Sequence, residues 1–105
     1  MEKFLIIYRG AAGGPELDSA EHNHAIWSAW FNSLGGALVD RGSLTHASVE
    51  VPSRLMGPKL SSSSLTGYSI IAAADFNAAV KLAEACPIFD EHGSVEIARL
   101  TGVPA

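Results

Sequence analysis

The stretch LTGYSIIAAADFNAAVKLAEACP, residues 65–87, joins a strand directly to a helix and decides the fold. Residues 65–74 form an apolar run of strand length, which predicts a central strand. Asp75 is a favourable N-cap residue and Pro87 cannot continue a helix, so we expect a helix between them. One face of this helix is expected to pack on the sheet, and it consists of Phe76, Ala79, Val80 and Ala83.

A matching strand and helix come earlier in the chain. Residues 3–9, KFLIIYR, form a continuous apolar run, which predicts a strand that is buried on both faces. A helix is expected to begin near Asp18, which makes a capping-box pattern with Glu21, and to end at the glycine pair 35–36. The apolar side chains of this helix share one stripe, made of Trp27, Trp30, Phe31, Leu34 and Leu38.

The segment between these two units contributes a strand and a long loop. Alternation across residues 44–51 predicts a strand with one polar face. Residues 52–64 hold two prolines, a glycine and a run of four serines, which predict a loop without regular structure. Residues 94–100 form the last strand. The order β-α-β-β-α-β predicts one domain, residues 1–105, of the ferredoxin-like α+β class, with two helices on one face of a four-stranded antiparallel sheet.

The face of this sheet that has no helices is expected to be buried by a partner protein. Both helices pack on the same face, whereas the strands at residues 3–9 and 65–74 are apolar on both faces. We therefore predict that the partner is a second copy of the chain, with the two sheets packed face to face in a homodimer.

Composition narrows the classes of function. The chain has 105 residues, a net charge of −4 and no run of Lys or Arg, which argues against nucleic-acid binding. The apolar run before Arg9 is too short for a signal peptide or a membrane span. The single Cys86 cannot form an internal disulfide, so the expected location is the cytoplasm. No phosphate-binding glycine motif and no metal-ligand spacing occurs, so neither a cofactor nor a metal is expected.

Two histidines near the start of the first helix are candidates for chemistry. His22 and His24 lie two residues apart, so they cannot form a helical metal pair. Both lie at the margins of the aromatic stripe. A neutral imidazole near a helix N-terminus would suit a general base, and His24 is the better placed. The alternative is that both are half-exposed polar residues of the first turn.

Further candidates have equally plain structural alternatives. Asp40 could orient a histidine, or it could be a turn residue at the start of a strand. Tyr68 could offer its phenol to a substrate, because the neighbouring Gly67 leaves space for a ligand or a partner chain, or it could be a buried tyrosine. Trp27 and Phe31 could line an aromatic ligand pocket, or they could be core residues.

The order and spacing of four segments resemble the YCII-related family of dimeric α/β-barrel proteins. The segments are KFLIIYR, HNHAIWSAWFNSLGGALVDRG, LTGYSIIAAADFNAAVKLAEACP and SVEIARL. Relatives look like small-molecule enzymes, among them a dehydrochlorinase acting on chlorinated hydroquinones. Many carry a histidine at the helix start that is proposed to pair with an aspartate before a proline. Here Cys86 precedes Pro87, and VDRGSL, residues 39–44, is the nearest stretch to the Asp-Gly-Pro-Phe motif of one branch, which is absent.

Two functions are expected from these observations. The resemblance implies a small cofactor-free enzyme that acts on an apolar or aromatic molecule by elimination or isomerisation, with His24 as acid/base and Tyr68 or Asp40 assisting. The alternative is a non-catalytic small-molecule-binding or interaction module, which Cys86 in the aspartate position favours. Cys86 itself is expected to be a small buried side chain rather than a nucleophile.

Overall fold

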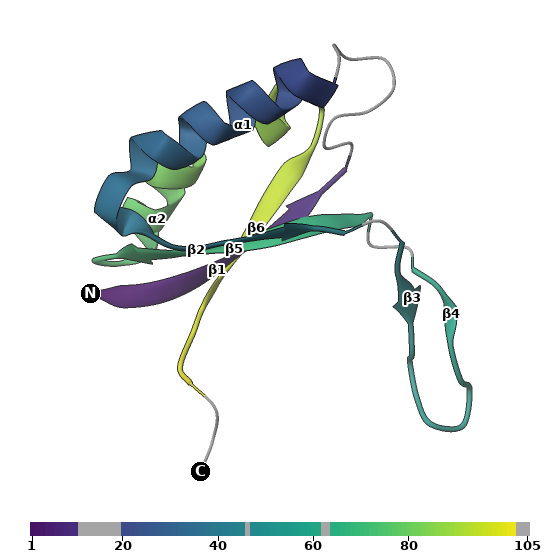
Figure 1. The fold of residues 1–105 in the computed structure, drawn as a ribbon. Helices are drawn as coiled ribbons and strands as arrows, with labels where there is room; N and C mark the ends of the chain where they lie inside the picture. Colours follow the sequence, from purple (N-terminus) through teal and green to yellow (C-terminus); the bar gives the residue numbers. More distant parts are fainter. Residues whose placement is uncertain (11–19, 46, 62–63, 103–105) are drawn as a thin grey trace.

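Both main helices lie on one face of a four-stranded antiparallel sheet (Figure 1). The computed structural model describes residues 1–10, 20–45, 47–61 and 64–102. The elements of this layered body are β1 (Glu2–Arg9), α1 (Ala20–Leu34), β2 (Leu38–Leu44), β5 (Leu65–Ala73), α2 (Phe76–Ala83) and β6 (Ser94–Arg99). The strand order β2-β5-β1-β6 is consistent with a ferredoxin-like fold, so the predicted α+β class is confirmed.

The two helices begin and end largely where the sequence predicts. The Asp75 carboxylate accepts a hydrogen bond from the Ala78 N–H at 2.8 Å, which confirms the N-cap of α2. Helix α1 ends before the short 3-10 turn η1 (Gly35–Ala37), as its glycine pair predicts. The capping box proposed at Asp18 lies outside the described residues.

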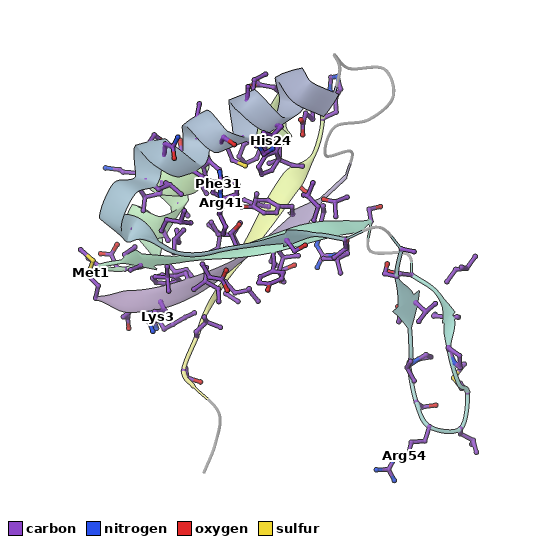
Figure 2. The ribbon with its side chains drawn as sticks, in the orientation of Figure 1. Met1, Lys3, His24, Phe31, Arg41 and Arg54 are labelled. Atoms are coloured by element: carbon purple, nitrogen blue, oxygen red, sulfur yellow. The ribbon has the colours of Figure 1, made fainter. Side chains whose placement is uncertain are left out.

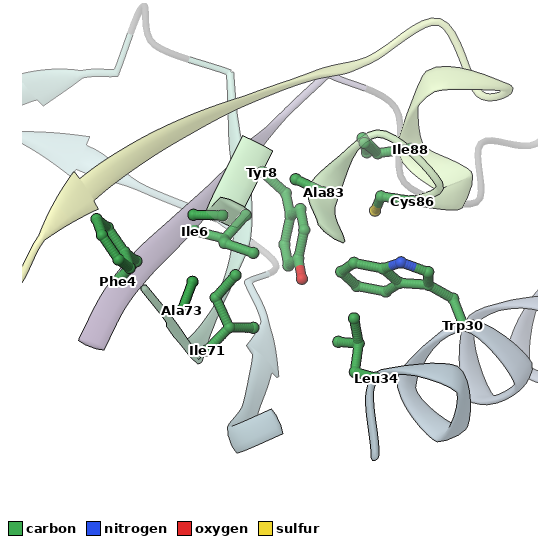
Figure 3. Close-up of a cluster of buried hydrophobic side chains, with 11 residues drawn as sticks. Phe4, Ile6, Tyr8, Trp30, Leu34, Ile71, Ala73, Ala83, Cys86 and Ile88 are labelled. Carbon is green, nitrogen blue, oxygen red and sulfur yellow. The ribbon is translucent and has the colours of Figure 1, made fainter. Parts of the chain in front are cut away.

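The core lies between α1, α2 and the sheet (Figure 3). Alternate side chains of β1 point into it, whereas those on the other side of the strand remain half-exposed in the single chain. The predicted stripe on α1 packs here. On α2 the predicted face is only partly right, because Phe76 and Val80 are more than a third exposed. The buried cluster consists of Phe4, Ile6, Tyr8, Trp30, Leu34, Ile71, Ala73, Ala79, Ala83, Cys86 and Ile88.

The middle of the chain differs from the prediction. The strand expected over residues 44–51 is wrong in position, because β2 begins at Leu38 and Leu44 is its last residue. Two bulges interrupt β2 and shift the phase of its alternation. The segment expected as an irregular loop contains β4 (Lys59–Leu60), which pairs with β3 (Val49–Glu50). These two short strands form a ribbon that projects from the body (Figure 1).

The second bulge of β2 depends on Gly42. Asp40 pairs with Ile70 and Ser43 pairs with Tyr68, so two residues of β2 stand opposite one residue of β5. Gly42 has a φ of +71°, in the left-handed region that favours glycine. Its N–H donates to the Asp40 carboxylate at 2.8 Å. Asp40 therefore closes the bulge of its own strand.

Candidate functional site

A buried carboxylate lies beneath helix α1, where the sequence alone suggests only a polar turn. The short turn η2 (Pro87–Phe89) follows α2, and the residues after it return toward α1. Glu91, in this return, is only 6% exposed. Its Oε1 accepts a hydrogen bond from the Trp27 indole N–H at 3.1 Å. Helix α1 and the η2 segment are thus joined by one polar contact within an aromatic environment.

The second oxygen of this carboxylate is buried without a partner. In the part of the chain that the structure describes, nothing donates a hydrogen bond to Glu91 Oε2. A buried acceptor left unsatisfied costs about 1–3 kcal/mol, and folded proteins satisfy nearly all such groups. Glu91 Oε2 therefore marks a point at which an N–H or O–H group would be stabilising.

Cys86 lies close enough to Glu91 to sense its charge. Burial raises the pKa of the Cys86 thiol from its ordinary 9.0 to about 12. A hydrogen bond with the Ile88 backbone opposes this rise, and the carboxylates of Glu91 and Asp90 add to it. The thiol is therefore protonated at neutral pH. A nucleophilic role for Cys86 is not supported, and its packing in the core matches the expected small buried side chain.

A buried polar chain crosses the core on the helix side of the sheet. The Tyr8 hydroxyl donates to Ser69 Oγ at 2.7 Å, and Ser69 Oγ donates to the Arg41 carbonyl at 2.6 Å. Burial raises the pKa of the Tyr8 phenol, a hydrogen bond with Ser69 lowers it, and the nearby Cys86 raises it further. The chain ties β1, β5 and the bulge of β2 together.

We expect stability to fall in alkaline solution because of these two groups. Below about pH 9 the thiol and the phenol are neutral in both the folded and the unfolded chain. Above that, the unfolded chain ionises first, since burial raises the pKa values of Cys86 and Tyr8 in the folded state. The free energy of unfolding should then drop by up to about 1.4 kcal/mol per pH unit for each group.

Urea unfolding between about pH 8 and pH 11 measures this slope. The variant Cys86→Ala should lose the fall in unfolding free energy that begins near pH 9. It should keep the fall at higher pH that Tyr8 causes. A free energy of unfolding that stays constant over this range, in the wild type, would contradict the assignment.

The aromatic side chains of α1 pack as one group above the sheet. Trp27 meets Tyr8 edge-on at 5.1 Å between ring centroids and Trp30 at 6.0 Å. Phe31 packs on both tryptophans, and the Arg41 guanidinium lies 4.8 Å from its ring centroid (Figure 2). Trp27 and Phe31 are therefore partly buried members of the core, and Trp27 also carries the polar contact to Glu91.

The histidines proposed for catalysis lie in the first half of α1. His24 is exposed, and no hydrogen bond or ion pair joins it to any described residue (Figure 2). Among the described residues, no carboxylate or tyrosine orients its ring. His22 belongs to the same helix, but its side chain lies outside the described residues.

The other two proposed catalytic residues lie on the opposite face of the sheet. Tyr68 pairs with Ile7, whose side chain points away from the helices, and Tyr68 is 39% exposed. Asp40 pairs with Ile70 on the same face. A single chain therefore does not bring Tyr68 or Asp40 to His24.

The space beside Tyr68 has a different explanation from the one expected. A Cβ atom at Gly67 would lie 2.7 Å from the Ser43 carbonyl oxygen. The backbone of β2, rather than a ligand or a partner chain, makes the close approach there.

Sequence reasoning missed Glu91, Tyr8 and Ser69. Trp27 and Glu91 are 64 positions apart, and Tyr8 and Ser69 are 61 apart. A polar residue within a turn after a helix carries no sign of burial. One signal was available: Ser69 and Tyr8 are side chains with a hydroxyl group within strands that are otherwise apolar and predicted to be in the core.

No protein-family model and no curated protein matches this chain. Among the described residues, no group of three or more His, Cys, Asp or Glu side chains is arranged to hold a metal ion. Within the same residues, no helix has both the length and the apolar character needed to cross a membrane.

Proposed function

We propose that the protein binds a small, largely apolar or aromatic molecule at Glu91 and does no chemistry on it. The observation that carries this proposal is the buried Oε2 of Glu91 beside the Trp27 indole, to which none of the described residues donates a hydrogen bond. A ligand N–H or O–H group would supply the missing hydrogen bond, and hydrogen bonds to charged groups contribute about 1.5–3 kcal/mol. Aromatic neighbours favour an apolar or aromatic body for the rest of the ligand.

The exposed position of His24 supports binding over His-dependent catalysis. A general base needs a ring held against its substrate, usually by a second polar group. His24 forms no such contact with the described residues, and Tyr68 lies across the sheet from the helices.

Acid/base catalysis is a second candidate, favoured by Glu91 itself. A carboxylate in an apolar environment is the kind of group that enzymes use to abstract a proton. His24 lies three residues before Trp27 on α1, so both could face one ligand. Membership of the YCII-related family is part of this second proposal, and the order of elements supports it.

The proposed assembly is a homodimer through the helix-free face of the sheet. We call this the open face, and it carries the half-buried or exposed side chains Leu5, Ile7, Tyr68, Ile70 and Ala72. The charged residues Asp40, Lys3 and Glu96 lie around these side chains on the same face. An apolar patch with a polar rim is typical of a protein interface. Pairing would bury both apolar sides of β1 and β5.

Binding of phenol and aniline tests the ligand site, because each probe combines an aromatic ring with one donor group. We expect both to shift the Trp27 indole N–H resonance in NMR spectra, and toluene, which has no donor, to bind at least about tenfold more weakly. The variant Glu91→Gln should weaken phenol binding by at least about tenfold, because its amide presents N–H groups where Oε2 accepts. Glu96→Gln, at an exposed position, is the matched control.

Two outcomes would decide against the proposal as stated. An unchanged Trp27 indole resonance at millimolar phenol and aniline would contradict ligand binding at Glu91. Exchange of solvent deuterium into the α-carbon of a bound aryl ketone, lost in Glu91→Gln, would replace binding by catalysis.

A further inference from the structure

The ribbon of β3 and β4 projects from the sheet on the side away from the helices (Figure 1). We call residues 47–61 the arm. Val49 pairs with Leu60, and Glu50 pairs with Lys59, whose side chains form an ion pair at 3.7 Å. Arg54 lies at the tip (Figure 2). An isolated two-stranded ribbon is marginally stable in water, so the arm needs further contacts to keep this shape.

The arm exposes more apolar surface than a free ribbon normally does. Leu55 is 97% exposed, Leu60 is 85% exposed and Met56 is 73% exposed. Val49 and Val51 are also mostly exposed. Large apolar side chains gathered on one projecting segment indicate an interaction surface.

The total exposed area indicates how much surface a partner would cover. The chain exposes 7092 Å², about 1,500 Å² more than a folded monomer of its mass is expected to expose. Its radius of gyration is 15.0 Å, against about 13 Å for a compact domain of this length. Interfaces of obligate homodimers bury about 1,000–2,500 Å² on each chain, so one partner of similar size accounts for the excess.

We propose that the arm of each protomer clasps a second copy of the chain and packs against its sheet. The inference rests on the proposed homodimer and adds to it the segment that holds the two copies together. The arm and the open face lie on the same side of the body, so one two-fold axis can place each arm on the other copy (Figure 1).

The reach of the arm fits this arrangement. Packed sheets lie about 10 Å apart, and the eight residues 47–54 of the arm can span up to about 26 Å when extended. The arm therefore extends beyond the level of a sheet stacked on the open face. Its apolar side chains then meet those of the partner instead of water, and the two-fold symmetry makes the same contact occur twice in the dimer.

The variant Leu55→Ser, Met56→Ser, Leu60→Ser tests the arm. We expect it to raise the dimer Kd, measured by sedimentation velocity, at least about tenfold. Val80→Ser, at an exposed apolar position on α2, is the control and should leave the Kd within about twofold of the wild type. An unchanged Kd in the arm variant would overturn the proposal.

A spin label distinguishes contact with the partner from contact within one chain. Leu55→Cys can be labelled selectively, because Cys86 is buried. In a mixture with ¹⁵N-labelled wild type, we expect broadening of the Leu5, Ile7 and Ile70 amides of the ¹⁵N chains. A dimer without this broadening would contradict the contact between the arm and the partner's sheet, and it would still be consistent with pairing of the two sheets.

Two further results would overturn the inference outright. A wild-type protein that is monomeric at micromolar concentration would contradict both the arm contact with a second copy and the pairing of the two sheets. Co-sedimentation with phosphatidylserine-containing vesicles, lost in the arm variant while the oligomeric state stays unchanged, would assign the arm to a membrane surface.

Discussion

Replacing Gly42 by alanine is expected to lower the free energy of unfolding by about 3 kcal/mol, the largest single effect on folding that the structure predicts. A Cβ atom at this position would lie 1.9 Å from the Tyr68 carbonyl oxygen, which is backbone and cannot rotate away. The left-handed φ of +71° adds a second penalty for any residue with a side chain. Strand β2 would have to separate from β5 at the bulge.

The control for this variant is Gly36→Ala. A Cβ atom at Gly36 would meet nothing within 4 Å, and this glycine does not have a positive φ. Urea unfolding of the two variants measures the difference directly. Equal midpoints for Gly42→Ala and Gly36→Ala would contradict the proposed role of the bulge.

The variant Ile70→Lys is expected to convert the proposed homodimer to monomers, with the largest effect on assembly. Ile70 lies on the open face opposite Leu5 and Asp40. In a two-fold dimer the substitution places one ammonium group from each protomer in the interface, beside the Asp40 carboxylate that already accepts from the Gly42 N–H. Taking such a charged pair out of water costs several kcal/mol. We therefore expect the dimer Kd to rise at least about 100-fold.

Sedimentation velocity measures this change, and the far-UV circular dichroism spectrum checks that the chain stays folded. Ile26→Lys is the matched control, because Ile26 is exposed on helix α1 and lies away from the open face. A dimer Kd that is the same for Ile70→Lys and the wild type would rule out pairing through the sheet. The arm would then need another partner.

Strands β1, β5 and β6, the start of α2 and the end of α1 were predictable because local chemistry sets them. Asp75 caps α2 through its own side chain, and the glycine pair after Leu34 ends α1. The continuous apolar runs around Ile6 and Ile71 are typical of buried strands, and both residues are fully buried in the core. None of these features depends on a distant residue.

The candidate site was not predictable in the same way. Alternation places Tyr68 on one face and Ser69 on the other, but only the pairing register shows which face the helices cover. The proposed combination of His24 with Tyr68 or Asp40 required all three on one side of the sheet. The register separates them. The alternation across residues 44–51 does not form one strand, because β2 ends at Leu44 and β3 holds only Val49 and Glu50.

The sequence by itself determined the order of the six main elements, the cap at Asp75 and the apolar strands, because propensity and periodicity act over a few neighbouring residues. The tertiary structure alone decided three features. It buried Glu91 against Trp27, set Gly42 against the Tyr68 carbonyl, and left the apolar arm exposed. Each depends on backbone segments far apart in the sequence, and pairing and packing, which bring such segments together, leave no local pattern.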